Sequence, residues 1–356
     1  MVSSDCRPWP GALRLSVCCA CGALQKPVTQ EWLQDIERLY MGYQVYTQAN
    51  GKEQQVAFDS KSGLGVARSA KIADWFMARE GLPVSGKLLD VGCGNGSFLR
   101  AFRNTNKDWY LVGLELDDRN KLLIETIPDT KLLVKPITEI DETFDAVVMV
   151  HALEHIPDPV QYLEKLSAVL VPEGFLLIEV PNFEKSPFDI LIADHCTHFT
   201  SKLLRGVVEA AGFEVIELAE DFILKELTLL ARKPKLEVAA KLDKLNGATL
   251  PNETEHILSE HLALLGNMLD TSEAIEGRFT ILASSISGTW LASELPEKII
   301  SFVDEDSNRV GGRHLGLPIL SPDQLPSGIP VFVPLRRDIA DRIIKRLSGK
   351  GIWFSI

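Results

Sequence analysis

The sequence predicts an α/β protein with a doubly wound parallel sheet, a small N-terminal cysteine lobe and a second, smaller C-terminal α/β domain. Three observations predict this fold class. The apolar run 87–91 leads into a glycine-rich turn and a helical pattern, and a second apolar run, 110–114, ends in Glu115. Strand-like runs then alternate with helix-like segments, and the alternation starts again after residue 278. This order of elements favours parallel sheets that are covered by helices on both faces.

The glycine-rich turn, Gly-Cys-Gly-Asn-Gly at 92–96, predicts a nucleotide site. Glycines let the backbone approach a ligand closely, and the following helix start offers free N–H groups. The carboxylate of Glu115 ends the next strand, where it can accept both hydroxyls of a ribose. Dinucleotide sites need a last glycine where this chain has Ser97. A structural turn or another nucleotide fold is the alternative interpretation.

The segments after the turn follow a familiar order. They are a buried strand at 144–150, His-Ala-Leu-Glu-His-Ile-Pro-Asp-Pro at 151–159, a helix, Leu-Val-Pro-Glu-Gly-Phe at 170–175, a strand at 176–182, and hairpin-like strands at 212–216 and 225–231. Together with the glycine turn and Asp90, this order resembles class I S-adenosylmethionine-dependent methyltransferases over residues 85–232. The resemblance implies a doubly wound, Rossmann-like methyltransferase sheet.

The resemblance also implies where S-adenosylmethionine binds. The methionine end would lie against the glycine turn, and Asp90 would orient that turn or meet the amino group. Glu115 would hold the ribose, and Leu116 or Asp117 would border the adenine. The expected cofactor-binding residues are Asp90, Gly92, Cys93, Gly94, Gly96, Glu115, Leu116, Asp117 and His151. A helix-capping or loop-bracing role is the alternative for Asp90.

Four histidines are candidates for a catalytic base. His151 and His155 lie one helical turn apart, and we expect them to begin a helix at the carboxyl edge of the sheet, where open α/β sites lie. His195 and His198 precede the last helix of this domain. A neutral imidazole can take a proton near pH 7. A structural role is the alternative for each of the four.

The stretch around His195 and His198 carries a second resemblance. At this place the sugar C-methyltransferases of the family have an H-E-H-x-x-Y-F-like stretch, whose histidine or tyrosine is implicated in deprotonating the sugar. When the two are aligned on Phe199, His195 matches the second histidine, Ala193 replaces the first, and His198 replaces the tyrosine. The match implies a histidine base.

Cysteines gather near the start of the chain. Cys18 and Cys21 form a C-x-x-C, Cys6 lies upstream, and Cys19 lies between them. The sugar C-methyltransferase group has a zinc lobe with two C-x-x-C pairs, but here Trp9 stands where the partner of Cys6 would be. Zinc bound by Cys6, Cys18 and Cys21, with a fourth ligand from Cys19 or elsewhere, is one expectation. A remnant lobe without metal is the other.

The chain divides into four expected parts. They are a cysteine lobe with a helix (1–48), the methyltransferase domain (49–233), a helical linker (234–277) and a C-terminal Rossmann-like domain (278–356). Further helices are expected at 30–46, 64–80, 236–245, 253–275 and 338–347, and further strands at 279–285, 299–304 and 330–334. The polar stretch 50–62 is expected to be a loop over the cofactor site.

The last part resembles the C-terminal domain of the sugar C-methyltransferases through its loop 311–322. Its first turn, 284–288, contains one glycine, whereas nucleotide-binding turns have several. We therefore expect a packing or substrate-clamping domain, with a second cofactor site as the alternative.

Composition limits the partners and the compartment. The net charge of −12 argues against a long nucleic-acid footprint, and no apolar run reaches membrane-spanning length. The segment 12–24 contains Arg14 and three cysteines, so it does not fit a signal peptide. Six cysteines without a disulfide-like spacing favour a reducing compartment, and we expect a cytoplasmic protein.

These observations predict an S-adenosylmethionine-dependent methyltransferase (EC 2.1.1.-) that acts on a small polar substrate. A nucleotide-linked sugar is the first candidate, with carbon methylation assisted by a histidine base. The alternatives are another small acceptor, such as a lipid, quinone precursor or polyketide, and a protein that binds the cofactor without turnover.

Overall fold

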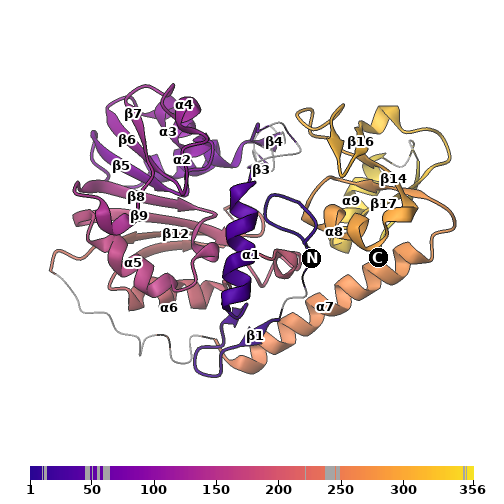
Figure 1. The fold of residues 1–356 in the computed structure, drawn as a ribbon, viewed down its shortest axis with the longest axis horizontal. Coiled ribbons are helices and arrows are strands. Elements are labelled where there is room, and N and C mark those ends of the chain that lie inside the picture. Colours follow the sequence, from indigo (N-terminus) through magenta and orange to yellow (C-terminus); the bar gives the residue numbers. More distant parts are fainter. Residues whose placement is uncertain are drawn as a thin grey trace.

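The computed structural model describes residues 1–9, 11, 14–44, 49, 51–53, 57–58, 65–220, 222–236, 245, 249–347, 349 and 351–356. These residues form a seven-stranded sheet, a six-stranded sheet and two small sheets (Figure 1). The predicted fold class is thereby confirmed. Within this part of the chain, no helix is both long enough and apolar enough to cross a membrane.

The seven-stranded sheet has the order β11-β12-β9-β8-β5-β6-β7. Its strands are β5 Gly86–Val91, β6 Trp109–Leu114, β7 Thr130–Leu133, β8 Phe144–Val150, β9 Leu170–Pro181, β11 Glu214–Ala219 and β12 Glu226–Arg232. Strands β5 to β9 are parallel, whereas β11 and β12 form an antiparallel hairpin beside β9. The strand order reverses between β5 and β8, and open α/β sheets bind ligands at such a switch point.

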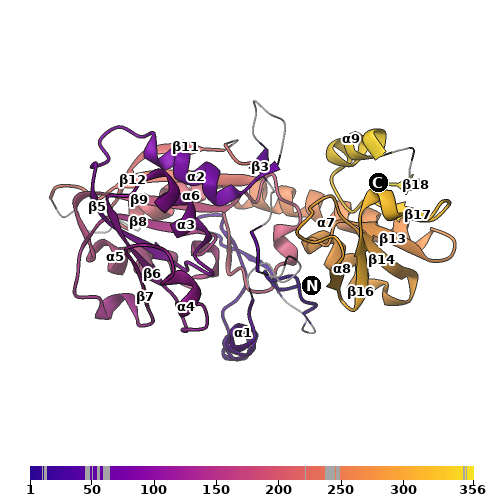
Figure 2. The ribbon, with the colours of Figure 1, turned by 90° about the horizontal axis from the view of Figure 1, so that it is seen from above.

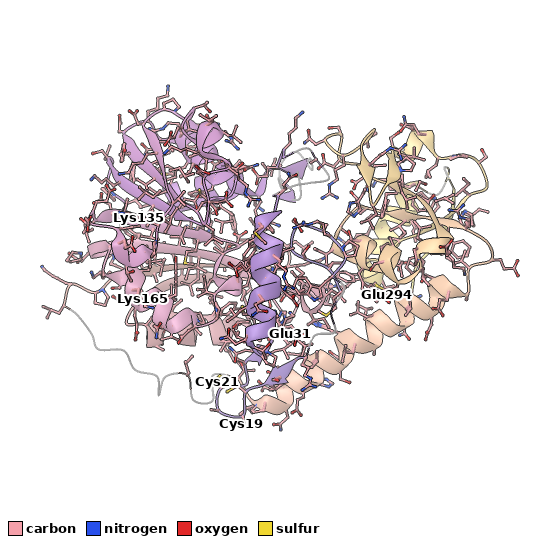
Figure 3. All side chains as sticks on the ribbon, in the orientation of Figure 1. Cys19, Cys21, Glu31, Lys135, Lys165 and Glu294 are labelled. Carbon is pink, nitrogen blue, oxygen red and sulfur yellow. The ribbon has the colours of Figure 1, made fainter. Side chains whose placement is uncertain are left out.

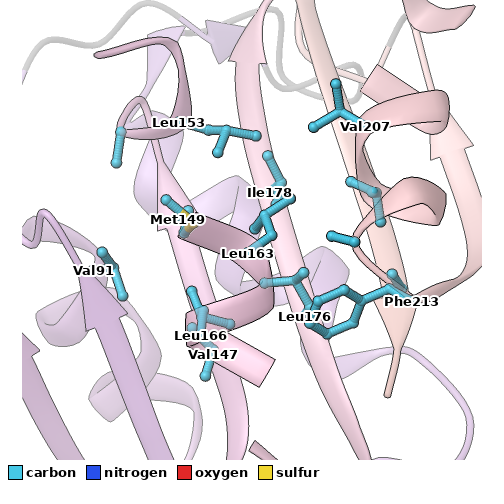
Figure 4. Close-up of a cluster of buried hydrophobic side chains, with 14 of the residues drawn as sticks. Val91, Val147, Met149, Leu153, Leu163, Leu166, Leu176, Ile178, Val207 and Phe213 are labelled. Atoms are coloured by element: carbon cyan, nitrogen blue, oxygen red, sulfur yellow. The ribbon is translucent and has the colours of Figure 1, made fainter. Parts of the chain in front are cut away.

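Helices cover both faces of this sheet. They are α2 Arg68–Met77, α3 Ser97–Thr105, α4 Lys121–Ile124, α5 Pro159–Ser167 and α6 Ser201–Ala210. On β8, Val147 and Met149 pack toward α5 and α6, while Ala146 and Val148 pack toward α2 and α3. Figure 4 shows the first of these clusters, in which Leu163 of α5 lies over the strands. A strand buried on both faces reads as a continuous apolar run, which explains why the sequence revealed it.

The N-terminal segment is tied to the seven-stranded domain. Strands β1 (Ser16–Val17) and β2 (Leu24–Gln25) pair with each other, and β2 also pairs with β10 (Thr197–His198). Helix α1 (Gln30–Met41) follows, and its Trp32 indole N–H donates to the carbonyl oxygen of Ala193. Figure 3 places Cys19 and Cys21 near the foot of α1. The lobe therefore packs against the segment that precedes α6.

The six-stranded sheet has the order β15-β16-β14-β13-β17-β18. Its strands are β13 Phe279–Leu282, β14 Ile299–Val303, β15 Arg313–His314, β16 Leu317–Leu320, β17 Pro330–Phe332 and β18 Ile352–Phe354, and its helices are α8 Ile286–Glu294 and α9 Arg337–Leu347. The long helix α7 (Pro251–Glu273) leads into it along one side of the molecule (Figures 1 and 2). Leu265 and Met268 of α7 join one apolar cluster with Val2, Phe183 and Phe279, so the two large domains share a packed boundary.

Several predicted boundaries are wrong in detail. Helix α1 stops before Gly42. Helix α2 is shorter than expected because residues 65–66 form strand β4, which pairs with β3 (Ala57–Phe58). Strand β13 stops at Leu282 because the next residue, Ala283, has φ +67°. The loop expected at 50–62 and the helix expected at 236–245 lie largely outside the described residues.

The expectation that His151 and His155 begin one helix is also wrong. His151 has φ +52°, only a 3₁₀ turn at Leu153–His155 follows, and α5 begins at Pro159. Two prolines, at 157 and 159, disfavour helical conformation in the residues that precede them, so the helix starts after this pair of histidines.

Candidate functional site

A cleft of about 1920 Å³ opens at the carboxyl edge of the seven-stranded sheet. The glycine turn lines it, and so do Ser285, Ser287 and Arg309 of the C-terminal domain. Tyr40 of α1 lies on the wall contributed by the N-terminal lobe. All three parts of the chain therefore meet at this cleft.

The glycine turn follows β5 directly. The amide of Gly92 donates to the carbonyl oxygen of Leu114 at 2.9 Å, which bends the chain back toward the end of β6. Gly92 has φ +69°, and a Cβ atom there would lie 3.1 Å from the Cβ of Ala152. A side chain is thus excluded both by conformation and by space. Gly96, at φ +79°, caps α3 and does not line the cleft, so its role is to start the helix.

Asp90 places a carboxylate beneath the turn. Its side chain is 2% exposed, and Oδ2 has no hydrogen-bond partner among the described residues. Burial, reinforced by the nearby Glu115, raises the pKa of Asp90 well above its usual value. A buried polar atom without a partner is costly. The amino group of an amino-acid ligand is a donor that fits this position.

Glu115 stands at the end of β6, as predicted. Its carboxylate accepts hydrogen bonds from the amides of Gly94 and Leu116. Burial raises the pKa of Glu115, and these two amides oppose the rise. Two oxygens offer about four lone pairs, so acceptor capacity remains for ribose hydroxyls. Leu116 and Asp117 continue along the same rim of the cleft.

Cys93 also lines the cleft, but its side chain is buried under the turn. Its sulfur would lie 2.6 Å from a Cβ atom built on Gly113. Burial raises the pKa of this thiol well above its usual value, so it is an inert packing group.

Sequence reasoning missed the side chains that hold this rim in place. Asn120 donates to the carbonyl oxygen of Gly94 at 3.1 Å, and Asn95 donates to the carbonyl oxygen of Gly51. Arg119 donates to the carbonyl oxygens of Tyr40 and Met41 at the end of α1. These partners lie far apart in the sequence, so no local pattern signals the contacts.

His151 lies between two carboxylates. Its Nδ1 is 3.1 Å from Glu154 Oε1, and its Nε2 is 3.3 Å from Glu226 Oε2. Burial by itself lowers the pKa of His151, but Glu226 and Glu154 outweigh it and raise that pKa to about 10. The ring is therefore an imidazolium at neutral pH, with no lone pair to accept a proton.

Three more groups complete what we call the His151 cluster. Arg68 donates to Glu226 Oε1 at 3.1 Å, and Thr228 donates to Glu179 Oε2 at 3.0 Å. Burial, followed by repulsion from Glu226, raises the pKa of Glu179 to about 7. Within the described residues, Glu179 Oε1, Glu226 Oε2 and His151 Nε2 are buried without a hydrogen bond. The cluster thus contains an ion pair between His151 Nε2 and Glu226 Oε2 and one further acceptor atom, Glu179 Oε1.

A chain of hydrogen bonds runs behind the cleft. The fully buried Lys26 has its Nζ 2.9 Å from His198 Nε2. His198 Nδ1 contacts Asp189 Oδ2, and His195 Nδ1 lies 2.7 Å from Asp189 Oδ1. An ammonium only donates and a carboxylate only accepts, so His198 accepts at Nε2 and donates from Nδ1, and His195 also donates from Nδ1. The lone pair of His195 is therefore on Nε2.

His155 has the same tautomer. Its Nδ1 lies 3.0 Å from the carbonyl oxygen of Asp194, which can only accept, so Nε2 carries the lone pair. The rings of His155 and His195 meet edge to face with centroids 4.7 Å apart. Burial and the neighbouring His195 lower the pKa of His155. For His195, burial lowers the pKa, but Asp189 outweighs it and the pKa is raised.

The four predicted histidines are thus separated. His151, His155 and His195 line the cleft, whereas His198 does not. Burial and then the charge of Lys26 lower the pKa of His198 to about 4, so it stays neutral, and both of its ring nitrogens have partners.

The predicted zinc ligands are not brought together. Cys18 and Cys21 share a hydrogen bond in the turn between β1 and β2, whereas Cys6 lines the cleft beside Tyr43. The described residues contain two groups of three potential ligand atoms within 4.8 Å of one another, and neither includes a cysteine. The cysteines that are present do not fit a four-ligand zinc site.

Comparison with known proteins defines the class. Residues 67–218 match the family model described as a methyltransferase domain. Together with the strand order and the glycine turn, this match makes that part of the chain a class I S-adenosylmethionine-dependent methyltransferase domain.

The individual relatives are distant. The chain is 25% identical to the C-methyltransferase NovU of Streptomyces niveus over 45% of this chain and 40% of that protein. It is 24% identical to the ubiquinone biosynthesis O-methyltransferase of Xanthomonas campestris pv. campestris (strain B100) over 33% of this chain and 52% of that protein. The chain thus spans about half the length of these relatives.

Among solved structures, the 1,6-didemethyltoxoflavin-N1-methyltransferase of Burkholderia thailandensis matches at 17% identity. The TM-score is 0.39, and the match covers 60% of this chain and 96% of that one.

Proposed function

We propose that this protein transfers a methyl group from S-adenosylmethionine to a small polar acceptor (EC 2.1.1.-), and that the acceptor is a nucleotide-linked sugar. One observation carries the proposal. A single cleft is lined by the bare glycine turn with Asp90 and Glu115 and also by His155 and His195. Cofactor and acceptor would therefore meet in one enclosed space.

The cofactor contacts follow from this geometry. Asp90 Oδ2 would accept from the amino group, Glu115 would hold the ribose hydroxyls, and the rim at Leu116 and Asp117 would border the adenine. Gly92 and Gly94 would admit the methionine end. The bound cofactor would supply an activated methyl group, so the protein has mainly to align the acceptor and manage its proton.

The His151 cluster supports a hydroxylated acceptor. Glu179 Oε1 is a buried acceptor atom without a hydrogen bond, and His151 Nε2 and Glu226 Oε2 form an ion pair 3.3 Å apart. An ammonium offers only donors and would be repelled by Arg68, whereas a pair of hydroxyls can both donate and accept. Sugars carry such pairs, and the similarity to a C-methyltransferase agrees with this substrate class.

His195 is the best-placed base. Asp189 orients its ring, and its Nε2 lone pair is on the side away from that carboxylate, as in other histidine bases supported by an acid. His155 is the second candidate because its pKa is lowered and the ring is neutral. His151 is charged, and His198 would hold Asp189 in place.

The test is methyl transfer to a panel of nucleotide sugars with labelled S-adenosylmethionine. We expect product with at least one sugar, a loss of at least 100-fold in H195N, and retained binding of S-adenosylhomocysteine by that variant. Binding of S-adenosylhomocysteine without transfer to any sugar would exclude this substrate class. No binding would exclude the enzyme itself.

A second candidate is methylation of another small acceptor, such as a quinone precursor. The similarity to a ubiquinone biosynthesis O-methyltransferase favours it. Including catechols and carboxylic acids in the same panel separates the two candidates.

For zinc, metal analysis of the purified protein and of a C18S/C21S variant tests whether the cysteine pair holds any metal.

A further inference from the structure

A second set of ligating atoms lies on the acceptor side of the cleft. Glu154 and His155 belong to the 3₁₀ turn after β8, and His195 belongs to the segment before β10. One ligating atom from each lies within 4.8 Å of the other two. Glu154 is 1% exposed and His195 3%, while His155 and His195 face the cleft.

Both histidines are fixed as a metal would need them. His155 donates from Nδ1 to the carbonyl oxygen of Asp194, and His195 donates from Nδ1 to the carboxylate of Asp189. Metal-bound histidines almost always donate their other ring N–H to a carbonyl or a carboxylate. Each ring therefore keeps its Nε2 lone pair for a ligand.

Glu154 provides an independent observation. Its Oε1 is held by His151, but Oε2 is buried without a hydrogen-bond partner among the described residues. A buried carboxylate oxygen without a partner costs free energy unless something binds it. Neither histidine can donate to it from Nε2 in these tautomers, so a cation is the partner that fits all three groups.

The ring geometry agrees with this arrangement. The two imidazole centroids lie 4.7 Å apart with an interplanar angle of 88°. Two imidazoles bound to one ion through nitrogens at about 2.1 Å have centroids roughly 4.6 Å apart when they subtend a right angle at the ion, and roughly 5.3 Å apart at the tetrahedral angle.

The other three-residue group lacks these properties. His151 is an imidazolium between two acids, and Arg68 already contacts both Glu179 and Glu226. A cation there would meet two positive charges and no free nitrogen lone pair. The two groups share residue types but only one is suited to a metal.

We propose that Glu154, His155 and His195 bind one divalent transition-metal ion in the cleft. Two imidazoles and one carboxylate suit Zn²⁺, Fe²⁺, Co²⁺ or Ni²⁺, and three protein ligands leave positions open on the cleft side. An acceptor oxygen can occupy such a position. This role rests on the proposed function, and it competes with the use of His195 as a base, because one lone pair cannot serve both. The metal content therefore decides between them.

The experiment uses the full chain with the substitutions C18S and C21S, so that the cysteine pair cannot bind metal. After removal of metal with EDTA, Co²⁺ is added and followed by calorimetry and by visible absorption. We expect one Co²⁺ per chain, with no sulfur-to-cobalt charge-transfer band. E154Q, H155N and H195N should each weaken binding at least 100-fold, and D189N should weaken it 10–100-fold by releasing the ring of His195.

E179Q is the matched control, since it removes a carboxylate from the His151 cluster, and it should leave Co²⁺ affinity unchanged. Thermal melts identify any variant that fails to fold. If a ligand variant does not fold, D189N still tests the site, because it changes the support of His195 and leaves all three ligands in place. The proposal is overturned if no Co²⁺ binds, or if one ion binds equally well to all three ligand variants. Binding of S-adenosylhomocysteine to the same samples reports separately on the proposed function.

Discussion

The two α/β units of this protein have the same topology around their first strands. They differ in the hydrogen-bond partners of the acid that follows the second strand. In the first unit, β5 leads through the glycine turn and α3 to β6, and Glu115 accepts from backbone amides. In the second, β13 leads through α8 to β14, and Asp304 accepts from Arg309 at 2.9 Å.

The turns differ as well. In the second unit a Cβ atom on Gly288 would lie 2.2 Å from the carbonyl oxygen of Ala283, so α8 packs directly on its turn, which contains one glycine where the first turn contains three. Ser284 also donates to Asp304. The two acids therefore differ in their partners, since Glu115 accepts from the backbone amides of Gly94 and Leu116 whereas Asp304 is paired with a buried arginine. The second unit is a wall of the cleft.

The largest effect is expected in the second unit, when the arginine that pairs with Asp304 is removed. Arg309→Met leaves the buried Asp304 without its cation, which should cost about 3–5 kcal/mol of unfolding free energy. It should not create nucleotide binding, because the turn still has a single glycine. Denaturant unfolding and calorimetry with S-adenosylhomocysteine, NAD and ATP check both points. Stoichiometric binding of any of these ligands in the second unit would show that freeing Asp304 from Arg309 is enough to create a ligand site.

A second test uses pH, because each unit buries one neutral histidine. Burial and Lys26 lower the pKa of His198 to about 4, and burial and Arg309 lower that of His314 to about 4. The unfolded chain takes up these protons near pH 6.5, so stability falls as pH drops from 6.5 toward 4, by about 3 kcal/mol for each histidine.

H198N and H314N should each flatten this fall relative to the wild type. The measurement is urea unfolding from pH 4 to 7, with an intrinsic probe in each unit. Equal pH dependence in wild type and H198N would contradict the assignment of a neutral, buried His198.

A third test addresses the acid of the first unit. Glu115→Gln removes the charge that would hold the ribose and should weaken S-adenosylhomocysteine binding about 100-fold, or about 2.7 kcal/mol. Asp304→Asn is the matched control in the second unit and should leave this affinity unchanged. Titration calorimetry measures both. Equal losses in the two variants would place the cofactor elsewhere.

The smallest effect is expected at the turn itself. Gly92→Ala adds a Cβ atom to a residue at φ +69°, 3.1 Å from Ala152, which should cost about 1–2 kcal/mol and about tenfold in cofactor affinity. Gly277→Ala, at φ +74° but with no neighbour within 4 Å, is the control for conformation alone. An unchanged affinity in Gly92→Ala would argue against close approach of a ligand.

Much of this contrast could be predicted from the sequence. The apolar runs of β5, β6 and β8 are buried on both faces, and the glycines and Glu115 have fixed spacings, so pattern alone located them. The single glycine of 284–288 also predicted a poor second site. Glu115 and Asp304 each follow the second strand of their unit. The sequence, however, did not indicate that Asp304 pairs with a buried arginine whereas Glu115 does not.

The histidines show where sequence reasoning stopped. Spacing placed His151 and His155 together, but two prolines broke the helix, and the partners of each ring come from remote segments. Lys26 lies 169 residues from the backbone oxygen of His195 that it contacts, and Asp189 reaches both His195 and His198. Tautomer and charge depend on such contacts, and no local pattern encodes them.

The hydrogen bonds from Arg119 to the last carbonyl groups of α1 connect two walls of the cleft. The same short segment that carries Leu116 and Asp117 into the cleft also anchors the N-terminal helix through its last carbonyl groups. Tyr40, whose carbonyl group accepts from Arg119, also places its hydroxyl 3.1 Å from Nδ1 of His155. One guanidinium group thus joins the segment after β6 to the helix beside His155, so replacing Arg119 would disturb both walls of the cleft at once.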